Sequence, residues 1–155
     1  MRSLFSFLLL SIAVAAARGA EVEFSRVWPA WREAESFDRI SEYFGGRENT
    51  GGHTLLRTHA EVRAGYYFLV RLKTPSVAPA GAKFVVNIIS PAAPEPKSYE
   101  FPVAVAAGGV FDLGLTGADW IDRKTHPVAW KLELRAADGR TLASTQSFLW
   151  AMPAP

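Results

Sequence analysis

Hydrophobic and polar residues alternate with a period of two along most of the chain beyond residue 65. The clearest run is 128–135, where apolar side chains occupy the even positions and Lys131, Glu133 and Arg135 occupy odd ones. Such alternation is typical of a β-strand with one buried and one solvated face, and it predicts that Trp130 lies between two sheets. Further runs at 66–73, 83–89, 98–105 and 111–115, a weaker run at 53–58 and a last run at 141–150 predict seven strands in total.

The segments between these runs are rich in proline and glycine and show no helical pattern. Asp138-Gly139 predicts a tight turn that joins 128–135 to 141–150, because this pair tolerates the positive φ of hairpin turns. The proline-rich stretch 91–96 predicts a stiff connector between two strands. Short strands joined by such turns predict an antiparallel sandwich rather than a parallel sheet.

The order and spacing of the runs from Gly52 to Trp150 resemble an immunoglobulin-like or fibronectin-type-III sandwich. The resemblance implies an all-β fold, a seven-stranded antiparallel immunoglobulin-like sandwich whose last strand pair is 128–150. The inter-sheet cysteine pair of true immunoglobulin domains is absent, because the chain has no cysteine. The resemblance implies no single function, since this fold carries adhesion, enzyme-accessory, chaperone and structural roles.

An N-terminal arm at 21–52 precedes the sandwich domain at 53–150, and a short tail at 151–155 follows it. Weak alternation at 21–27 predicts a short strand that ends at Trp28-Pro29. From Trp31 the apolar positions 31, 34, 37, 40 and 44 follow a helical spacing, which predicts one helix at about 31–44. Four glycines within 45–52 predict a loop after it.

Residues 1–20 have the layout of a secretory signal peptide. Arg2 precedes an apolar run at 4–17, and the small residues Ala15-Ala16-Ala17 fit a cleavage signal. The alternative is a membrane anchor, but a helix of this run covers only about 21 Å of a hydrocarbon core of about 30 Å. We therefore expect an exported protein, periplasmic or extracellular, with no stable membrane span after cleavage.

Charge and composition exclude some classes of function. The chain has 155 residues, with 17 Lys and Arg against 15 Asp and Glu. Cleavage after Gly19 or Ala20 would remove Arg2 and Arg18 and leave equal numbers, 15 of each sign, which predicts no nucleic-acid partner. The lack of cysteine excludes disulfides, a thiolate nucleophile and a thiolate zinc site.

The connection 117–126 contains the residues best suited to chemistry. Asp119, Asp122 and His126 are of the types that bind metal ions, and a loop can bring them together. In the alternative interpretation, which we favour, this connection is a capped helical turn. Asp119 then accepts backbone N–H groups, and Trp120 fills the end of the sandwich.

Exposed aromatic side chains are the other candidate binding groups, because flat rings stack on sugars and on partner proteins. The candidates are Trp28, Trp31, Tyr67 and Trp120, although Trp28 and Trp31 can equally pack the arm onto the sandwich. We expect a non-catalytic interaction or structural module, without a cofactor, that binds a protein or an envelope component. One alternative is a carbohydrate-binding accessory domain with a polysaccharide partner, and another is a small metal-dependent hydrolase built on the 117–126 connection.

Overall fold

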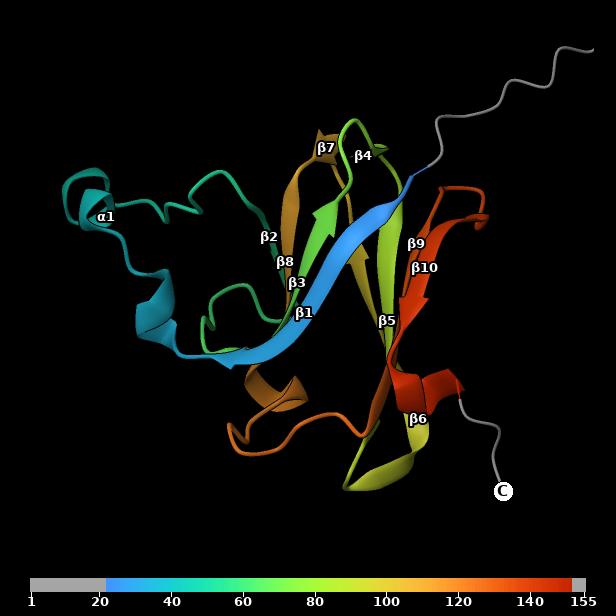
Figure 1. The fold of residues 1–155 in the computed structure, drawn as a ribbon. Coiled ribbons are helices and arrows are strands. Elements are labelled where there is room, and N and C mark those ends of the chain that lie inside the picture. The colour runs from blue at the N-terminus through green and yellow to red at the C-terminus, as the bar shows by residue number, and fades with distance from the viewer. Residues whose placement is uncertain (1–21, 152–155) are drawn as a thin grey trace, which may run out of the picture.

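The protein is all-β, as the alternation predicted. The computed structural model describes residues 22–151, and this part of the chain forms ten strands, one short α-helix and three 3₁₀ turns (Figure 1). The predicted signal peptide at 1–20 lies outside the described residues, as does the tail from 152 onwards.

Eight of these strands form two four-stranded sheets. The first sheet has the order β1-β3-β8-β2 and the second the order β10-β9-β5-β6, while β4 and β7 pair in a small third sheet. Neighbouring strands are antiparallel except β2, which runs parallel to β8. The strands are β1 (Phe24–Arg32), β2 (Thr54–Arg57), β3 (Gly65–Leu72), β4 (Val77–Ala78), β5 (Lys83–Ser90), β6 (Ala93–Pro102), β7 (Ala107–Gly108), β8 (Val110–Thr116), β9 (Ala129–Arg135) and β10 (Thr141–Gln146).

All seven strands predicted for the sandwich form, but the predicted count of seven is wrong, because β1, β4 and β7 add three. The short strand predicted at 21–27 corresponds to the start of β1, which continues to Arg32. Trp28-Pro29 does not end it, since β1 lies at the edge of the first sheet and a proline there need not donate to a neighbour. The proline-rich stretch 91–96 likewise contains the start of an edge strand, β6.

The predicted helix at 31–44 does not form as one element. Strand β1 continues to Arg32, and a 3₁₀ turn η1 (Ala34–Phe37) and a short helix α1 (Ile40–Gly45) follow. Pairing of Trp31 with Tyr66 in the first sheet overrides the local helical spacing. The predicted stop is confirmed, because Gly46 ends α1 in the left-handed conformation at φ 62°.

The core lies between the two large sheets. Aromatic rings of the two sheets pack on one another. The ring centres of Phe84 in β5 and Phe111 in β8 are 4.8 Å apart. Those of Phe68 in β3 and Trp130 in β9 are 5.5 Å apart. Trp130 therefore faces the opposite sheet, as predicted, although it is only partly buried. The fully buried side chains of the core include Phe68, Val70, Phe84, Val86, Phe111, Leu113, Leu115, Leu132 and Leu134.

The arm docks on the outer face of the first sheet through Phe37. This ring is buried, lies 4.8 Å from the ring of Tyr67, and has the guanidinium carbons of Arg32 and Arg57 at 4.4 and 4.9 Å. Cation–π attraction strengthens when the cation is desolvated, and the side chain of Arg57 is 4% exposed. The arm thus packs on its own domain.

Candidate functional site

The connection between β8 and β9 closes one end of the sandwich with Trp120. This side chain is 8% exposed, its ring lies 5.2 Å from the ring of Tyr66, and its indole N–H donates to the Thr125 carbonyl at 3.2 Å. The predicted filling of the sandwich end by Trp120 is confirmed. A 3₁₀ turn η2 (Gly117–Asp119) begins the connection, which agrees with the predicted helical turn.

The capping acid of this connection is Asp122 rather than Asp119. Asp122 accepts hydrogen bonds from the Lys124 backbone N–H and from the Thr125 hydroxyl, and these two contacts lower its pKa. A carboxylate that accepts from a residue two positions ahead forms a local turn of its own. The expectation that Asp119 accepts backbone N–H bonds was therefore wrong.

Asp119 instead joins separate parts of the chain through ion pairs. Its carboxylate lies 3.2 Å from His59 Nε2 and 3.3 Å from Lys97 Nζ. Lys97 belongs to β6 and also lies over the ring of Tyr99, at 4.8 Å from its centre. The pKa of Lys97 is raised, mainly by its interaction with Tyr99 and to a smaller extent by Asp119. These contacts hold the 117–126 connection beside β6.

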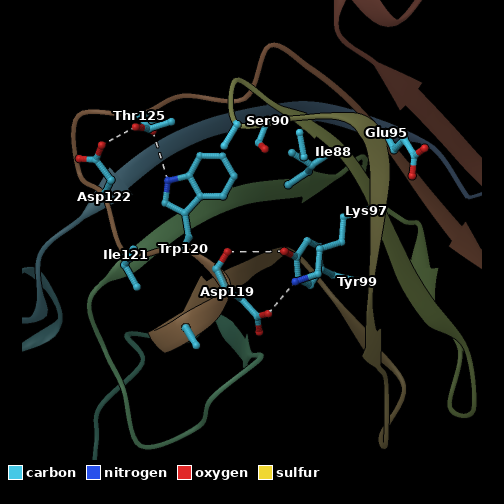
Figure 2. Close-up of a pocket in the computed structure, with 13 residues that line it drawn as sticks. Ile88, Ser90, Glu95, Lys97, Tyr99, Asp119, Trp120, Ile121, Asp122 and Thr125 are labelled. Atoms are coloured by element: carbon cyan, nitrogen blue, oxygen red, sulfur yellow. Dashed lines mark hydrogen bonds and ion pairs between the residues drawn. The ribbon is translucent and has the colours of Figure 1, made fainter.

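A pocket of about 400 Å³, which we call the end pocket, lies between this connection and the β5–β6 hairpin. Figure 2 shows Trp120 inside it, with Tyr99 and Lys97 approaching from β6 and the Asp122–Thr125 pair beyond the indole nitrogen. The volume is in the usual range for ligand sites. Apolar side chains line much of it: Ile88, Ala92, Ala93, Tyr99, Ala118, Trp120 and Ile121. The polar lining residues are Ser90, Glu95, Lys97, Asp119, Asp122 and Thr125.

The four aromatic residues predicted to bind a partner do not form a common surface. Trp28 is 55% exposed on the outer face of β1, whereas Trp31 packs against the core. Tyr67 is on the outer face of β3 but only 1% exposed, because the arm covers it. Trp28 and Tyr67 line one shallow hollow on that face, while Trp120 alone of the four lines the end pocket.

The three candidate metal ligands do not converge either. Asp119 and Asp122 have the separate partners described above, and the ring of His126 packs at 5.9 Å from that of Tyr66. Among residues 22–151, no three His, Asp or Glu side chains are grouped so that they could hold a metal ion.

A second group of charged side chains lies on the outer face of the first sheet, around the buried carboxylate of Asp112. Asp112 of β8 is buried; its carboxylate lies 2.8 Å from His53 Nδ1 and 3.6 Å from the Arg32 guanidinium. The Oδ1 atom has no hydrogen-bond partner among the described residues. The adjoining cavity measures about 30 Å³, which leaves room for little more than ordered water.

Sequence reasoning missed the β6 side of the end pocket. Tyr99 was predicted as part of an ordinary strand and Lys97 lay just before it, and no short motif connects them with Asp119, which lies 20 and 22 residues away. No local pattern in the sequence indicates this contact, because its residues lie far apart along the chain. The chain matches no protein-family model, and it shows no significant similarity to a curated protein or a solved structure.

Proposed function

We propose that the protein is an exported, non-catalytic β-sandwich interaction module that uses the end pocket to bind an apolar side chain of a partner protein. The observation that supports this most strongly is the composition of the pocket, which combines an apolar interior with charged groups at its edge. Protein interfaces are built in the same way, with desolvated anchor pockets surrounded by polar residues.

The charged groups of the pocket are suited to recognition more than to proton transfer. Asp119 is engaged by His59 and Lys97, and Asp122 by Thr125. Paired groups of this kind hold the pocket walls in a fixed geometry, which lowers the entropic cost of binding. The hydrolase alternative gains no support, because its three proposed residues do not converge.

Filling the pocket tests this proposal. Ala118→Trp places a large ring at the pocket, and Ala104→Trp makes the same change at an exposed position away from it. A photo-crosslinking residue in place of Ile121, which is at the pocket and largely exposed, should give a discrete protein adduct in the native compartment. Ala118→Trp should abolish the adduct and Ala104→Trp should not. An adduct that survives Ala118→Trp contradicts the proposal.

Export and fold class complete the proposal. The signal peptide at 1–20 is tested by the intact mass of exported protein, which should begin near Arg18, Ala20 or Glu21; retention of Met1 contradicts it.

Two facing four-stranded sheets and the β9–β10 hairpin support an immunoglobulin-like sandwich. The parallel β2 and the β4–β7 pair are departures from that pattern.

A carbohydrate-binding role is the second candidate, favoured by Tyr99 and Trp120 beside Lys97 and Glu95 in one pocket. Aromatic faces and charged hydrogen-bonding groups are the two components of sugar recognition. Affinity electrophoresis in gels that contain soluble polysaccharides tests it. Retardation that Lys97→Ala abolishes, and that Lys83→Ala on the same sheet leaves unchanged, would favour this candidate over the first.

A further inference from the structure

The arm segment 33–52 exposes large apolar side chains, whereas an ordinary surface segment exposes mainly polar ones. Three apolar side chains of α1 are almost fully exposed: Ile40 at 80%, Tyr43 at 86% and Phe44 at 88%. Figure 1 shows α1 projecting away from both large sheets. Surface helices normally turn their apolar side chains toward the core, so an apolar cluster directed outward marks an interaction site.

Most acidic side chains of the same segment are engaged by arginines from the rest of the domain. Four of its five acidic residues form ion pairs with arginines outside the segment, and Glu35 is the exception. The pairs are Glu33–Arg123 at 3.1 Å, Asp38–Arg63 at 2.7 Å, Glu42–Arg63 at 2.9 Å and Glu48–Arg57 at 2.6 Å. These contacts fix which side of the segment faces solvent.

The basic residues of the segment show the opposite behaviour. Arg39 precedes α1 and Arg47 follows its glycine end, both are exposed, and neither makes an ion pair with any described residue. The stretch 39–47 therefore combines the three exposed apolar side chains with two guanidinium groups that have no ion pair, against one carboxylate, that of Glu42, which Arg63 engages. The net charge of this stretch is positive, although the segment 33–52 as a whole is acidic.

Hydrogen bonds within the segment hold this arrangement in place. The Asn49 backbone N–H donates to Glu42 Oε1 at 3.1 Å, and the Asn49 side-chain amide donates to Ser41 Oγ at 2.8 Å. The loop after α1 is thus tied back to the polar side of the helix. The apolar side chains remain outward, because turning the helix over would break these bonds and the ion pair between Glu42 and Arg63.

We propose that α1, with Arg39 and Arg47, binds the surface of an anionic lipid bilayer. Aromatic and aliphatic side chains insert at the depth of the headgroups, and arginines bind lipid phosphates, so both components of the cluster are satisfied together. Within residues 22–151, no helix has the length and apolar character needed to cross a membrane. The proposed contact is therefore with the membrane surface.

The shape of α1 favours a bilayer over a protein partner. A stable protein interface buries about 800 Å² on each side, usually over a broad patch. A projecting helix of six residues presents a narrow convex tip, which a fluid surface can surround but a flat protein surface cannot. With three apolar groups and two cations, we expect weak, reversible binding comparable to that of a single acyl chain. This site is separate from the end pocket, so the inference does not depend on the proposed function.

Vesicle co-sedimentation of the exported protein tests the proposal, using vesicles of phosphatidylcholine with and without phosphatidylglycerol. Wild type should bind the phosphatidylglycerol vesicles and lose binding as salt is added. The triple variant Ile40→Ser, Tyr43→Ser, Phe44→Ser should lose at least about tenfold in affinity for these vesicles. A matched triple variant at other exposed apolar positions, Val105→Ser, Phe148→Ser, Leu149→Ser, should bind as wild type does.

A charge variant separates the two components of binding. Arg39→Gln with Arg47→Gln should weaken binding about tenfold and remove most of its salt dependence. Equal binding to both kinds of vesicle, or full binding by the α1 triple variant, overturns the proposal. Absence of vesicle binding together with a protein crosslink from position 43 in the native compartment also overturns it, and assigns α1 to a protein partner instead.

Discussion

Removal of one oxygen atom from Tyr67 should cost far more stability than the same change at its neighbour Tyr66. Both side chains are buried, and burial raises the pKa of both phenols. The Tyr67 hydroxyl accepts from Arg57 Nε at 2.7 Å and donates to the Arg63 carbonyl at 2.6 Å. The Tyr66 hydroxyl makes no hydrogen bond with any described residue. Tyr66→Phe is therefore a matched control for Tyr67→Phe.

The expected magnitude follows from the two lost hydrogen bonds. One involves a charged donor whose side chain is 4% exposed, and such bonds contribute about 1.5–3 kcal/mol, whereas the neutral bond contributes about 1 kcal/mol. Arg57 keeps two hydrogen bonds to Glu48, so we expect a net loss of about 2–3 kcal/mol for Tyr67→Phe.

Equilibrium urea denaturation measures this difference. A loss of this size moves the midpoint by roughly 1 M, and Tyr66→Phe should remain within about 0.5 kcal/mol of wild type. If the two variants unfold within about 0.5 kcal/mol of each other, the Tyr67 hydroxyl does not link β3 to Arg57 of β2 and to the Arg63 carbonyl, and the reasoning about this buried network fails.

Three other outcomes are expected. The pKa of Glu48 is lowered, chiefly by its arginine partner, so its contribution to stability is present above about pH 4.3 and lost as the pH falls through the lowered pKa. Protection factors in 38–52, which correct for the slower intrinsic exchange at low pH, should therefore fall at low pH, and Glu48→Gln should lower them at neutral pH too. A Cβ at Gly114 would lie 2.4 Å from the Tyr67 ring, so Gly114→Ala should lower the melting midpoint, whereas Gly45→Ala, with open space around it, should not. Zn²⁺ or Ca²⁺ should leave the midpoint unchanged in calorimetry, and a rise with metal concentration would reinstate a metal site in the 117–126 connection.

The strands could be predicted from the sequence because alternation is a local property of each run. Residues such as Leu132 and Leu134 reach the core whichever strand lies beside them. Strand β1 could not be predicted in full, because its extent depends on Trp31 pairing with Tyr66, 35 residues away. The predicted helix failed at that point, since cross-strand pairing outweighed a helical spacing of apolar residues.

The candidate site was predictable only in part, for a similar reason. The burial of Trp120 at the end of the sandwich could be predicted, because this large apolar residue lies in a connection between two strands. The predicted outward direction of Tyr67 also agrees with the structure, but its burial depends on Phe37 of the arm, which alternation cannot indicate. The end pocket depends on the ion pair between Lys97 and Asp119, and a contact between two such surface charges has no local signal.

The prolines of β6 influence how copies of this protein meet at high concentration. Val103 donates its backbone N–H to Ala82 on the β5 side, so the preceding position, Pro102, faces the free edge of the sheet, where it offers no donor. Pro94 and Pro96 remove two further donors from the same strand. A second copy that approached this edge would meet carbonyl oxygens without a continuous row of N–H groups, and so could not extend the sheet. The β6 edge of the second sheet is thereby protected against edge-to-edge pairing between copies.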